Sequence, residues 1–293
     1  MSMISTATKP IFVIGTGRCG STIFHQIFSY HSQVAWLSRT CEMYPQHPHR
    51  NYLAMRLLDA PLPQKYLRKL IYPVEAYNFW DNYCYGFGEP MRDLLKEDVL
   101  PITKKRLQKV MASMLTENRA RLLIKITGWS RIGFLKEIFP DAKFIHIYRD
   151  GRAVVNSWLN VDWWQGWHGP HHWQWGQLSP QQEQLWHRHN QSFVALGGIL
   201  WDILMTATDK AKELIPPEDY LEIRYEDFCQ QPVKLFQQAV DFCDLAWSSE
   251  FETAIHSFKM ESADYKWKEQ LTLPQQQILN ASLRDALQRY GYE

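Results

Sequence analysis

The chain has 293 residues, with 32 Lys or Arg, 31 Asp or Glu and a net charge of +1. This balance excludes a global field that would recruit nucleic acid or an anionic membrane, so any anion must be bound by a local cluster. The length suits one large α/β domain or two small ones. Five cysteines without a CxxC pair favour a reducing, cytoplasmic setting. The N-terminal apolar run is too short for a signal peptide or a membrane span.

The first predicted elements are a strand and a helix joined by the glycine-rich loop GTGRCGS. A continuous apolar run predicts a buried parallel strand over residues 11–15, and helical spacing of apolar residues predicts a helix over residues 22–30. Such a loop presents backbone N–H groups to an anion, and the helix N-terminus adds about half a positive charge. Gly15, Gly17 and Gly20 permit positive φ and close approach of a ligand. The loop therefore predicts an anion site, and a turn that binds nothing fits this strand and helix context less well.

Strand-like runs alternate with helical patterns along the rest of the chain. The predicted strands cover residues 34–38, 122–128, 143–150 and 220–227, and the predicted helices cover residues 101–120, 130–141, 151–160, 181–214 (one helix or two) and 232–245. This alternation predicts an α/β fold with a parallel central sheet flanked by helices. Because no repeat or composition break appears, we expect one domain over residues 1–293, with excursions at about 40–120 and 158–190.

The loop has the glycine spacing of a nucleotide-triphosphate site but lacks its lysine. Ser21 stands where Lys is expected, and the cation of the loop is Arg18. Nucleotide triphosphatases also need an Asp that helps to hold Mg²⁺. Asp150 ends an apolar run and could imitate it, but Arg149 and Arg152 flank it. These residues fit better an anion that is transferred without a metal, and no metal site is expected.

Two stretches resemble signatures of the sulfotransferases that use 3′-phosphoadenosine-5′-phosphosulfate (PAPS). The loop that binds the 5′-phosphosulfate in that family is similar to residues 12–22, FVIGTGRCGST. The family's 3′-phosphate signature is similar to residues 144–158, FIHIYRDGRAVVNSW. An Arg ends a strand there and a Ser follows eight positions later, as Arg149 and Ser157 do here. Further similarity extends over residues 220–245 and over residues 265–272, YKWKEQLT, a segment whose basic residues approach the 3′-phosphate in the family.

The resemblance implies a three-layer sandwich like that of the P-loop nucleotide triphosphatases, with PAPS as co-substrate and 3′-phosphoadenosine-5′-phosphate (PAP) as product. It assigns Arg18 to the bridging and leaving oxygens. The residues implied to bind the nucleotide are Gly15, Thr16, Gly17, Arg18, Cys19, Gly20, Ser21, Thr22, Arg149, Ser157, Lys266 and Lys268. The physical expectation agrees, because the carboxyl ends of parallel strands open on one edge of a sheet and one nucleotide can span them.

An acceptor hydroxyl needs a general base. Cytosolic members of the family often use a His just after the strand that matches residues 122–128, but Thr127 stands here. Other branches use a Glu some twenty residues past the loop. Glu42 is the nearest candidate, a few positions beyond that place, and Glu89 in a Gly/Pro loop is the alternative. Either could instead be a solvated or salt-bridged carboxylate, and His25 is expected to pack beneath the loop.

The segment 158–190 is rich in aromatic residues, and seven of the thirteen tryptophans lie between Trp158 and Trp186. Trp and His offer flat, rigid surfaces with single polar groups, which suit an aromatic, sugar or lipid-like acceptor. A small core that holds a long loop, or an oligomer interface, explains them equally well. The histidines lack the nearby Cys or acid set of a metal site, although one could serve as the base. The candidate acceptor contacts are Trp163, Trp167, His168 and His172.

The sequence thus predicts a sulfotransferase that moves a sulfuryl group from PAPS to a hydroxyl or amine of a small-molecule or glycan acceptor, without a metal. We expect no nucleic-acid partner and no membrane span, and a homo-oligomer stays open. Two alternatives remain: a P-loop kinase or other nucleotide phosphotransferase, and a catalytically inactive nucleotide-binding scaffold.

Overall fold

The five predicted strands form one parallel sheet. The structure is a computed structural model that describes residues 8–61, 64–170, 176–262 and 265–293. Within these residues the sheet has the order β2-β3-β1-β4-β5. Its strands are β1 (Ile11–Gly15), β2 (Val34–Trp36), β3 (Arg121–Thr127), β4 (Lys143–Tyr148) and β5 (Tyr220–Arg224). All neighbouring strands pair in parallel, so their carboxyl ends lie at one edge. The predicted α/β fold is confirmed.

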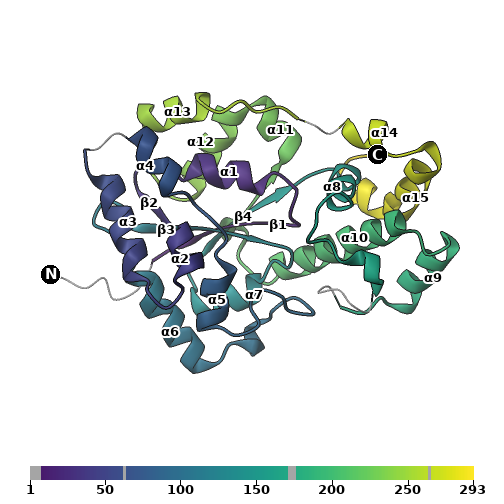
Figure 1. Cartoon of the computed structure of the whole chain (residues 1–293), viewed down its shortest axis with the longest axis horizontal. Helices are drawn as coiled ribbons and strands as arrows, with labels where there is room; N and C mark the ends of the chain where they lie inside the picture. Colours follow the sequence, from purple (N-terminus) through teal and green to yellow (C-terminus); the bar gives the residue numbers. More distant parts are fainter. Residues whose placement is uncertain (1–7, 62–63, 171–175, 263–264) are drawn as a thin grey trace.

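Helices cover both faces of this sheet, as Figure 1 shows with α1, α12 and α13 on one side and α7 and α10 on the other. The α-helices are α1 (Ser21–Phe28), α2 (Arg39–Met43), α3 (His49–Asp59), α4 (Gln64–Leu70), α5 (Tyr77–Tyr83), α6 (Pro101–Ala112), α7 (Ile132–Ile138), α8 (Gly151–Trp158), α9 (Pro180–Arg188), α10 (Phe193–Lys212), α11 (Tyr225–Gln230), α12 (Pro232–Phe242), α13 (Ser249–His256), α14 (Lys266–Gln270) and α15 (Leu273–Arg289). Short 3₁₀ turns are η1 (Lys96–Asp98), η2 (Gly166–His168) and η4 (Pro217–Asp219).

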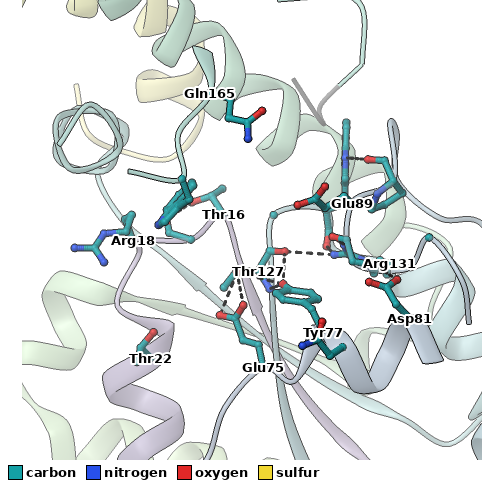
Figure 2. A pocket seen from close by; sticks show the side chains of 18 of the residues that line it. Thr16, Arg18, Thr22, Glu75, Tyr77, Asp81, Glu89, Thr127, Arg131 and Gln165 are labelled. Carbon is teal, nitrogen blue, oxygen red and sulfur yellow. Dashed lines mark hydrogen bonds between the residues drawn. The ribbon is translucent and has the colours of Figure 1, made fainter. Parts of the chain in front are cut away.

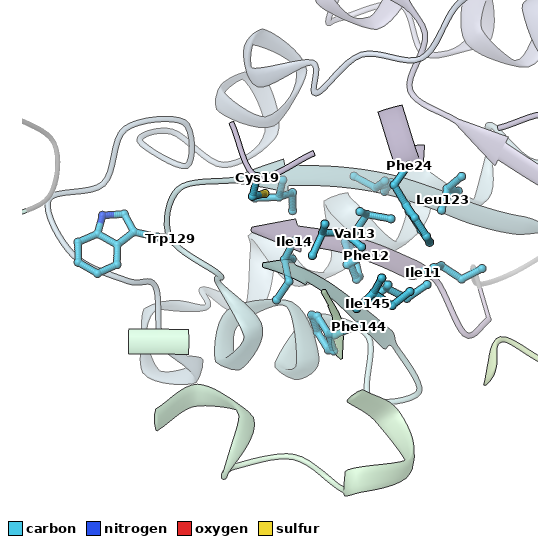
Figure 3. Close-up of a cluster of buried hydrophobic side chains, with 14 of the residues drawn as sticks. Ile11, Phe12, Val13, Ile14, Cys19, Phe24, Leu123, Trp129, Phe144 and Ile145 are labelled. Atoms are coloured by element: carbon cyan, nitrogen blue, oxygen red, sulfur yellow. The ribbon is translucent and has the colours of Figure 1, made fainter. Parts of the chain in front are cut away.

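The central strand β1 is buried on both faces. Its apolar residues from Ile11 to Ile14 have no exposed surface (Figure 3). Phe12 stacks on Phe144 of the neighbouring strand β4, with ring centroids 5.5 Å apart. On the other face, Phe24 of α1 stacks on Phe236 of α12 at 4.7 Å. This packing fixes the end of β1, and therefore the position of the glycine loop that follows it.

Several predicted boundaries differ from the structure. The helix predicted over residues 101–120 ends at Ala112. The pattern over residues 181–214 is two helices, because Asn190 and Gln191 adopt positive φ of 50° and 56° and Ser192 caps the second helix. The strand predicted over residues 220–227 ends at Arg224, and α11 begins directly after it.

Both predicted excursions have structure of their own. The segment 40–120 contains the helices α2 to α6 and η1, and the segment 158–190 contains η2 and α9. None of the helices described is both long enough and apolar enough to pass through a membrane.

Candidate functional site

The glycine loop is held in a conformation that places its backbone at the N-terminus of α1. Gly17, Arg18 and Gly20 have positive φ of 79°, 57° and 93°. A Cβ at Gly20 would collide with the ring of Tyr225, so glycine is needed there for space as well as for φ. Gly20 caps α1 without a side-chain acceptor, and the first turn has no acidic residue. These features suit an anion at the helix N-terminus.

The second signature meets this loop directly. Arg18 donates from Nε to Oγ of Ser157 in α8 at 2.8 Å. Arg149, which follows β4, donates from Nη1 to the carbonyl oxygen of Arg18 at 3.2 Å, and its guanidinium lies 4.6 Å from the ring centroid of Tyr225. Two cations and a hydroxyl from segments about 130 residues apart therefore gather at one edge of the sheet, as predicted. We call residues 15–22 together with 149–157 the loop edge.

The loop edge opens into a cavity of about 1320 Å³. Ile23 and Gln26 of α1 also line it, and the remaining lining residues come from 75–91, 127–131 and 163–165, three segments that we call the far wall. Figure 2 shows both parts, with Arg18 and Thr22 on one side and Glu89, Asp81 and Arg131 on the other. The cavity therefore has two chemically different walls. The loop edge carries cationic side chains, and the far wall carries acidic, basic and apolar side chains.

A carboxylate that lines the cavity, that of Glu75, is paired with Lys125, which lies outside the lining, and we call Glu75, Lys125, Tyr77 and Thr127 the cavity floor. Lys125 of β3 forms an ion pair with Glu75, with Nζ 2.6 Å from Oε1, and it also donates to Oγ1 of Thr22 at 2.7 Å. Thr127 donates from Oγ1 to both Glu75 oxygens at 3.2 Å. The side chains of Lys125 and Glu75 are only 8% and 21% exposed. Lys125 therefore joins Glu75 of the far wall to Thr22 of the loop edge.

Two further polar side chains, the half-buried Tyr77 and the buried Arg131, stiffen the far wall. The hydroxyl of Tyr77 donates to the carbonyl oxygen of Thr127 and accepts from its N–H, both at 3.1 Å. Burial, together with the nearby Glu75 charge, raises the pKa of Tyr77 to about 12. Arg131, which is 1% exposed, donates to the carbonyl oxygens of Phe87 and Gly88. The loop that carries residues 84–91 is therefore fixed against the sheet.

Most predicted nucleotide-binding residues gather at the loop edge. Those that line the cavity are Thr16, Gly17, Arg18, Gly20, Thr22, Arg149 and Ser157. Gly15, Cys19 and Ser21 are buried beneath them. Lys266 and Lys268 lie apart, as exposed residues of α14, which packs on α8. Their neighbour Trp267 is buried under Arg152, with the guanidinium 4.8 Å from its ring centroid.

The two candidate bases have different surroundings. Glu89 lines the cavity on the far wall and is exposed. Glu42 lies outside the cavity lining, and its Oε2 accepts a hydrogen bond from the backbone N–H of Asn78 at the start of α5, at 3.2 Å. His25 is packed beneath the loop as expected, and burial with the nearby Lys125 charge lowers its pKa to about 3.

Of the candidate acceptor contacts, some line the cavity and others lie outside its lining. Trp163 lines the cavity. Trp167 instead packs on Trp164 and Phe193, with ring centroids 4.7 and 4.8 Å apart, and forms a small aromatic cluster that holds η2. His168 belongs to η2 outside the cavity lining, and His172 lies outside the described residues.

Sequence reasoning missed the polar residues of the cavity floor. Lys125 left a signal, because a charged residue inside the apolar run LLIKIT must face a partner or a site. Glu75 and Tyr77 left none, since they precede and begin a short helix in a segment without periodicity, and only the fold brings them to β3.

Comparison with known proteins gives the class of this fold and site. A family model described as the sulfotransferase family matches residues 10–249. The chain belongs to the sulfotransferase family, and the enzyme class predicted from its sequence is confirmed.

Individual relatives are distant but cover nearly the whole chain. The chain is 24% identical over 315 aligned residues to the omega-hydroxy-beta-dihydromenaquinone-9 sulfotransferase Stf3 of Mycobacterium bovis, a match that covers 98% of this chain and 76% of that protein. Among solved structures, sulfotransferase STF9 from Mycobacterium avium superposes with a TM-score of 0.57 at 15% identity, over 97% of this chain and 77% of that one. The sulfotransferase domain from the curacin biosynthetic pathway superposes with a TM-score of 0.51 at 14% identity, over 99% of both chains. These structures share the fold of this chain.

Proposed function

We propose that the protein transfers a sulfuryl group from PAPS to a hydroxyl group of a small-molecule acceptor. The observation that carries this proposal is the meeting of Arg18, Arg149 and Ser157 at the edge of a large cavity. PAPS has two separated anionic groups, and this edge offers a loop of backbone amides for one and a guanidinium with a hydroxyl for the other. Family membership supports the same assignment.

Each residue of the loop edge has a proposed role in an in-line displacement at sulfur. The loop amides and Thr22 hold the 5′-phosphate, and Arg18 stabilises the charge that develops on the bridging and leaving oxygens. Arg149 and Ser157 bind the 3′-phosphate, and Lys266 and Lys268 approach it from α14. Because the loop supplies its own cation, the transfer is proposed to need no metal.

The far wall supports an acceptor with an aromatic or lipid-like part rather than a glycan. Tyr85, Met91 and Trp163 line the cavity and are 99%, 69% and 43% exposed, so apolar surface faces solvent where an acceptor would enter. Exposed apolar surface of this kind is commonly covered by a ligand. The curated relative is named for a hydroxylated menaquinone derivative, which also supports a hydroxyl acceptor.

The setting proposed for the protein is a reducing, cytoplasmic one. Cys19, Cys41, Cys84, Cys229 and Cys243 are all free thiols in the structure. Free cysteines are typical of reducing compartments, where disulfides do not persist.

Thermal unfolding with PAP, ADP and ATP·Mg²⁺ tests the co-substrate. A ligand at 100 times its Kd stabilises the native state by about 2.7 kcal/mol, which raises Tm by on the order of 5 °C in a chain of this size. We expect this shift with PAP and a much smaller one with ADP, which lacks the 3′-phosphate. Arg149→Ala should remove the advantage of PAP over ADP. A larger shift with ATP·Mg²⁺ than with PAP would support a phosphotransferase instead, and PAP binding without any transfer from PAPS would support an inactive scaffold.

A further inference from the structure

The cavity floor holds a carboxylate that the family resemblance did not supply. Glu75 lies between the bridge that pairs Ser38 with Pro73 and the start of α5, and its side chain lines the cavity. Burial of a charged pair costs several kcal/mol of desolvation, which apolar residues in the same place would avoid. The Glu75–Lys125 pair, at 21% and 8% exposure, is therefore a candidate for a functional rather than a stabilising role.

Glu75 is held in place by an ion pair and by hydrogen bonds. The ammonium group of Lys125 lies 2.6 Å from Oε1, and the Thr127 hydroxyl donates to both carboxylate oxygens. Lys125 and Thr127 hold the Glu75 carboxylate by these contacts, and the exposed part of the Glu75 side chain lines the cavity (Figure 2). An ionised carboxylate accepts protons and cannot donate one, so it can serve as a base.

Glu75 also lies close to where the transferred group must be. Lys125 contacts both Glu75 and Thr22, and Thr22 belongs to the first turn of α1 beside the anion loop. One ammonium group therefore separates the carboxylate from the loop edge. In Figure 2, Glu75 lies near Thr22, whereas Glu89 and Asp81 lie on the opposite side of the cavity from Arg18.

The other titratable groups near the floor are poor bases. His25 is enclosed and its pKa is lowered to about 3 by burial, so it holds a proton only weakly. Tyr77 is neutral near pH 7 like any tyrosine, and burial raises its pKa further, to about 12. Glu42 is held by the N–H of Asn78 outside the cavity lining, and Asp81 accepts from the N–H of Gly88.

We propose that Glu75 is the general base that takes the proton from the acceptor hydroxyl. As the acceptor oxygen forms its bond to sulfur, the bond from sulfur to the 5′-phosphate oxygen breaks and its electron pair stays on the departing PAP. The acceptor proton passes to the Glu75 carboxylate and then to solvent. Lys125 balances the charge of Glu75 and joins it to Thr22 of the loop edge. This step rests on the proposed transfer from PAPS.

The test is Glu75→Gln, which keeps the shape of the side chain and removes its basicity. With PAPS and benzyl alcohol, a weakly acidic hydroxyl, we expect kcat to fall by about 10²–10⁴-fold. With 4-nitrophenol, which ionises readily in water, the loss should be far smaller, because little proton removal is needed. Glu75→Asp should restore part of the activity.

The control is Glu137→Gln, which breaks an equally short but more exposed ion pair, between Glu137 and Lys104 at 2.7 Å, outside the cavity lining. Glu137→Gln should leave kcat unchanged with both benzyl alcohol and 4-nitrophenol. The PAP-induced Tm shift of Glu75→Gln should equal that of the wild type. Three results would overturn the proposal: turnover of Glu75→Gln within about threefold of wild type, an equal loss on both acceptors, or the same selective loss on benzyl alcohol in Glu42→Gln or Glu89→Gln instead. A wild type that binds PAP but transfers nothing from PAPS contradicts the proposed function itself.

Discussion

The loop edge and the far wall face the same cavity but are assembled differently. The loop edge uses residues that directly follow two strands of the sheet, β1 and β4, so strand burial positions them. The far wall draws on the segments 75–91, 127–131 and 163–165, and Arg131 and Tyr77 fix it by hydrogen bonds to backbone carbonyls. The proposed PAPS side thus follows strands of the sheet, whereas the proposed acceptor side comes mostly from the two excursions.

Among the substitutions that test this comparison, Arg18→Ala should have the largest effect on kcat. Loss of one preorganised charge donor at the leaving oxygens should lower kcat by about 10²–10³-fold. Binding of PAP should survive in part, because Arg149 and the loop amides remain. Steady-state kinetics with PAPS would measure the loss, and turnover near that of the wild type would remove Arg18 from its proposed role.

Gly20→Ala tests whether the backbone of the loop, and not only its charges, makes the site. The new methyl group would adopt φ of 93° and collide with the Tyr225 ring, so the loop must shift. Strain of this kind costs about 1–3 kcal/mol in the free energy of unfolding, and the PAP-induced Tm shift should be largely lost. Gly169→Ala is the matched control, since Gly169 has φ of 82° and open space around it. Equal effects of the two variants on PAP binding would contradict the account.

Trp163→Ala should weaken the use of the acceptor and leave PAPS binding unchanged. Removal of a partly exposed ring from the cavity should lower kcat/KM for an aromatic acceptor by about tenfold, or about 1.4 kcal/mol. KM for PAPS and the PAP-induced Tm shift should stay close to those of the wild type. A parallel rise in KM for PAPS would mean that the two sides of the cavity are not separable.

The smallest expected effect belongs to Lys266→Ala and Lys268→Ala. Both lysines are exposed, and screened surface charges contribute roughly 0.2–1 kcal/mol each. Each variant should weaken PAP by less than about fivefold, and the difference should shrink as salt is raised. A loss as large as that of Arg149→Ala would show that α14 belongs to the nucleotide site itself.

The contrast between the loop edge and the far wall also explains which parts of the fold and the site could be predicted from the sequence alone. The strands, the glycine loop and its position at the same sheet edge as the segment from Arg149 to Ser157 followed from local patterns, because buried parallel strands are apolar runs and their ends share one edge. Glu75 and Lys125 could not be paired in advance, since Glu75 lies in a segment without clear periodicity, far from Lys125 in the sequence. The break between α9 and α10 was equally hidden, because it depends on positive φ at Asn190 and Gln191, which many sequences allow.

The most direct test of the central claim is a transfer assay with PAPS, a panel of aromatic and lipid-like alcohols, and EDTA to remove divalent metals. We predict that PAP and a sulfated product form in equal amounts, and that the reaction proceeds without a metal. No PAP release with any acceptor, or transfer of a phosphoryl group from ATP·Mg²⁺ in place of a sulfuryl group, would contradict the account.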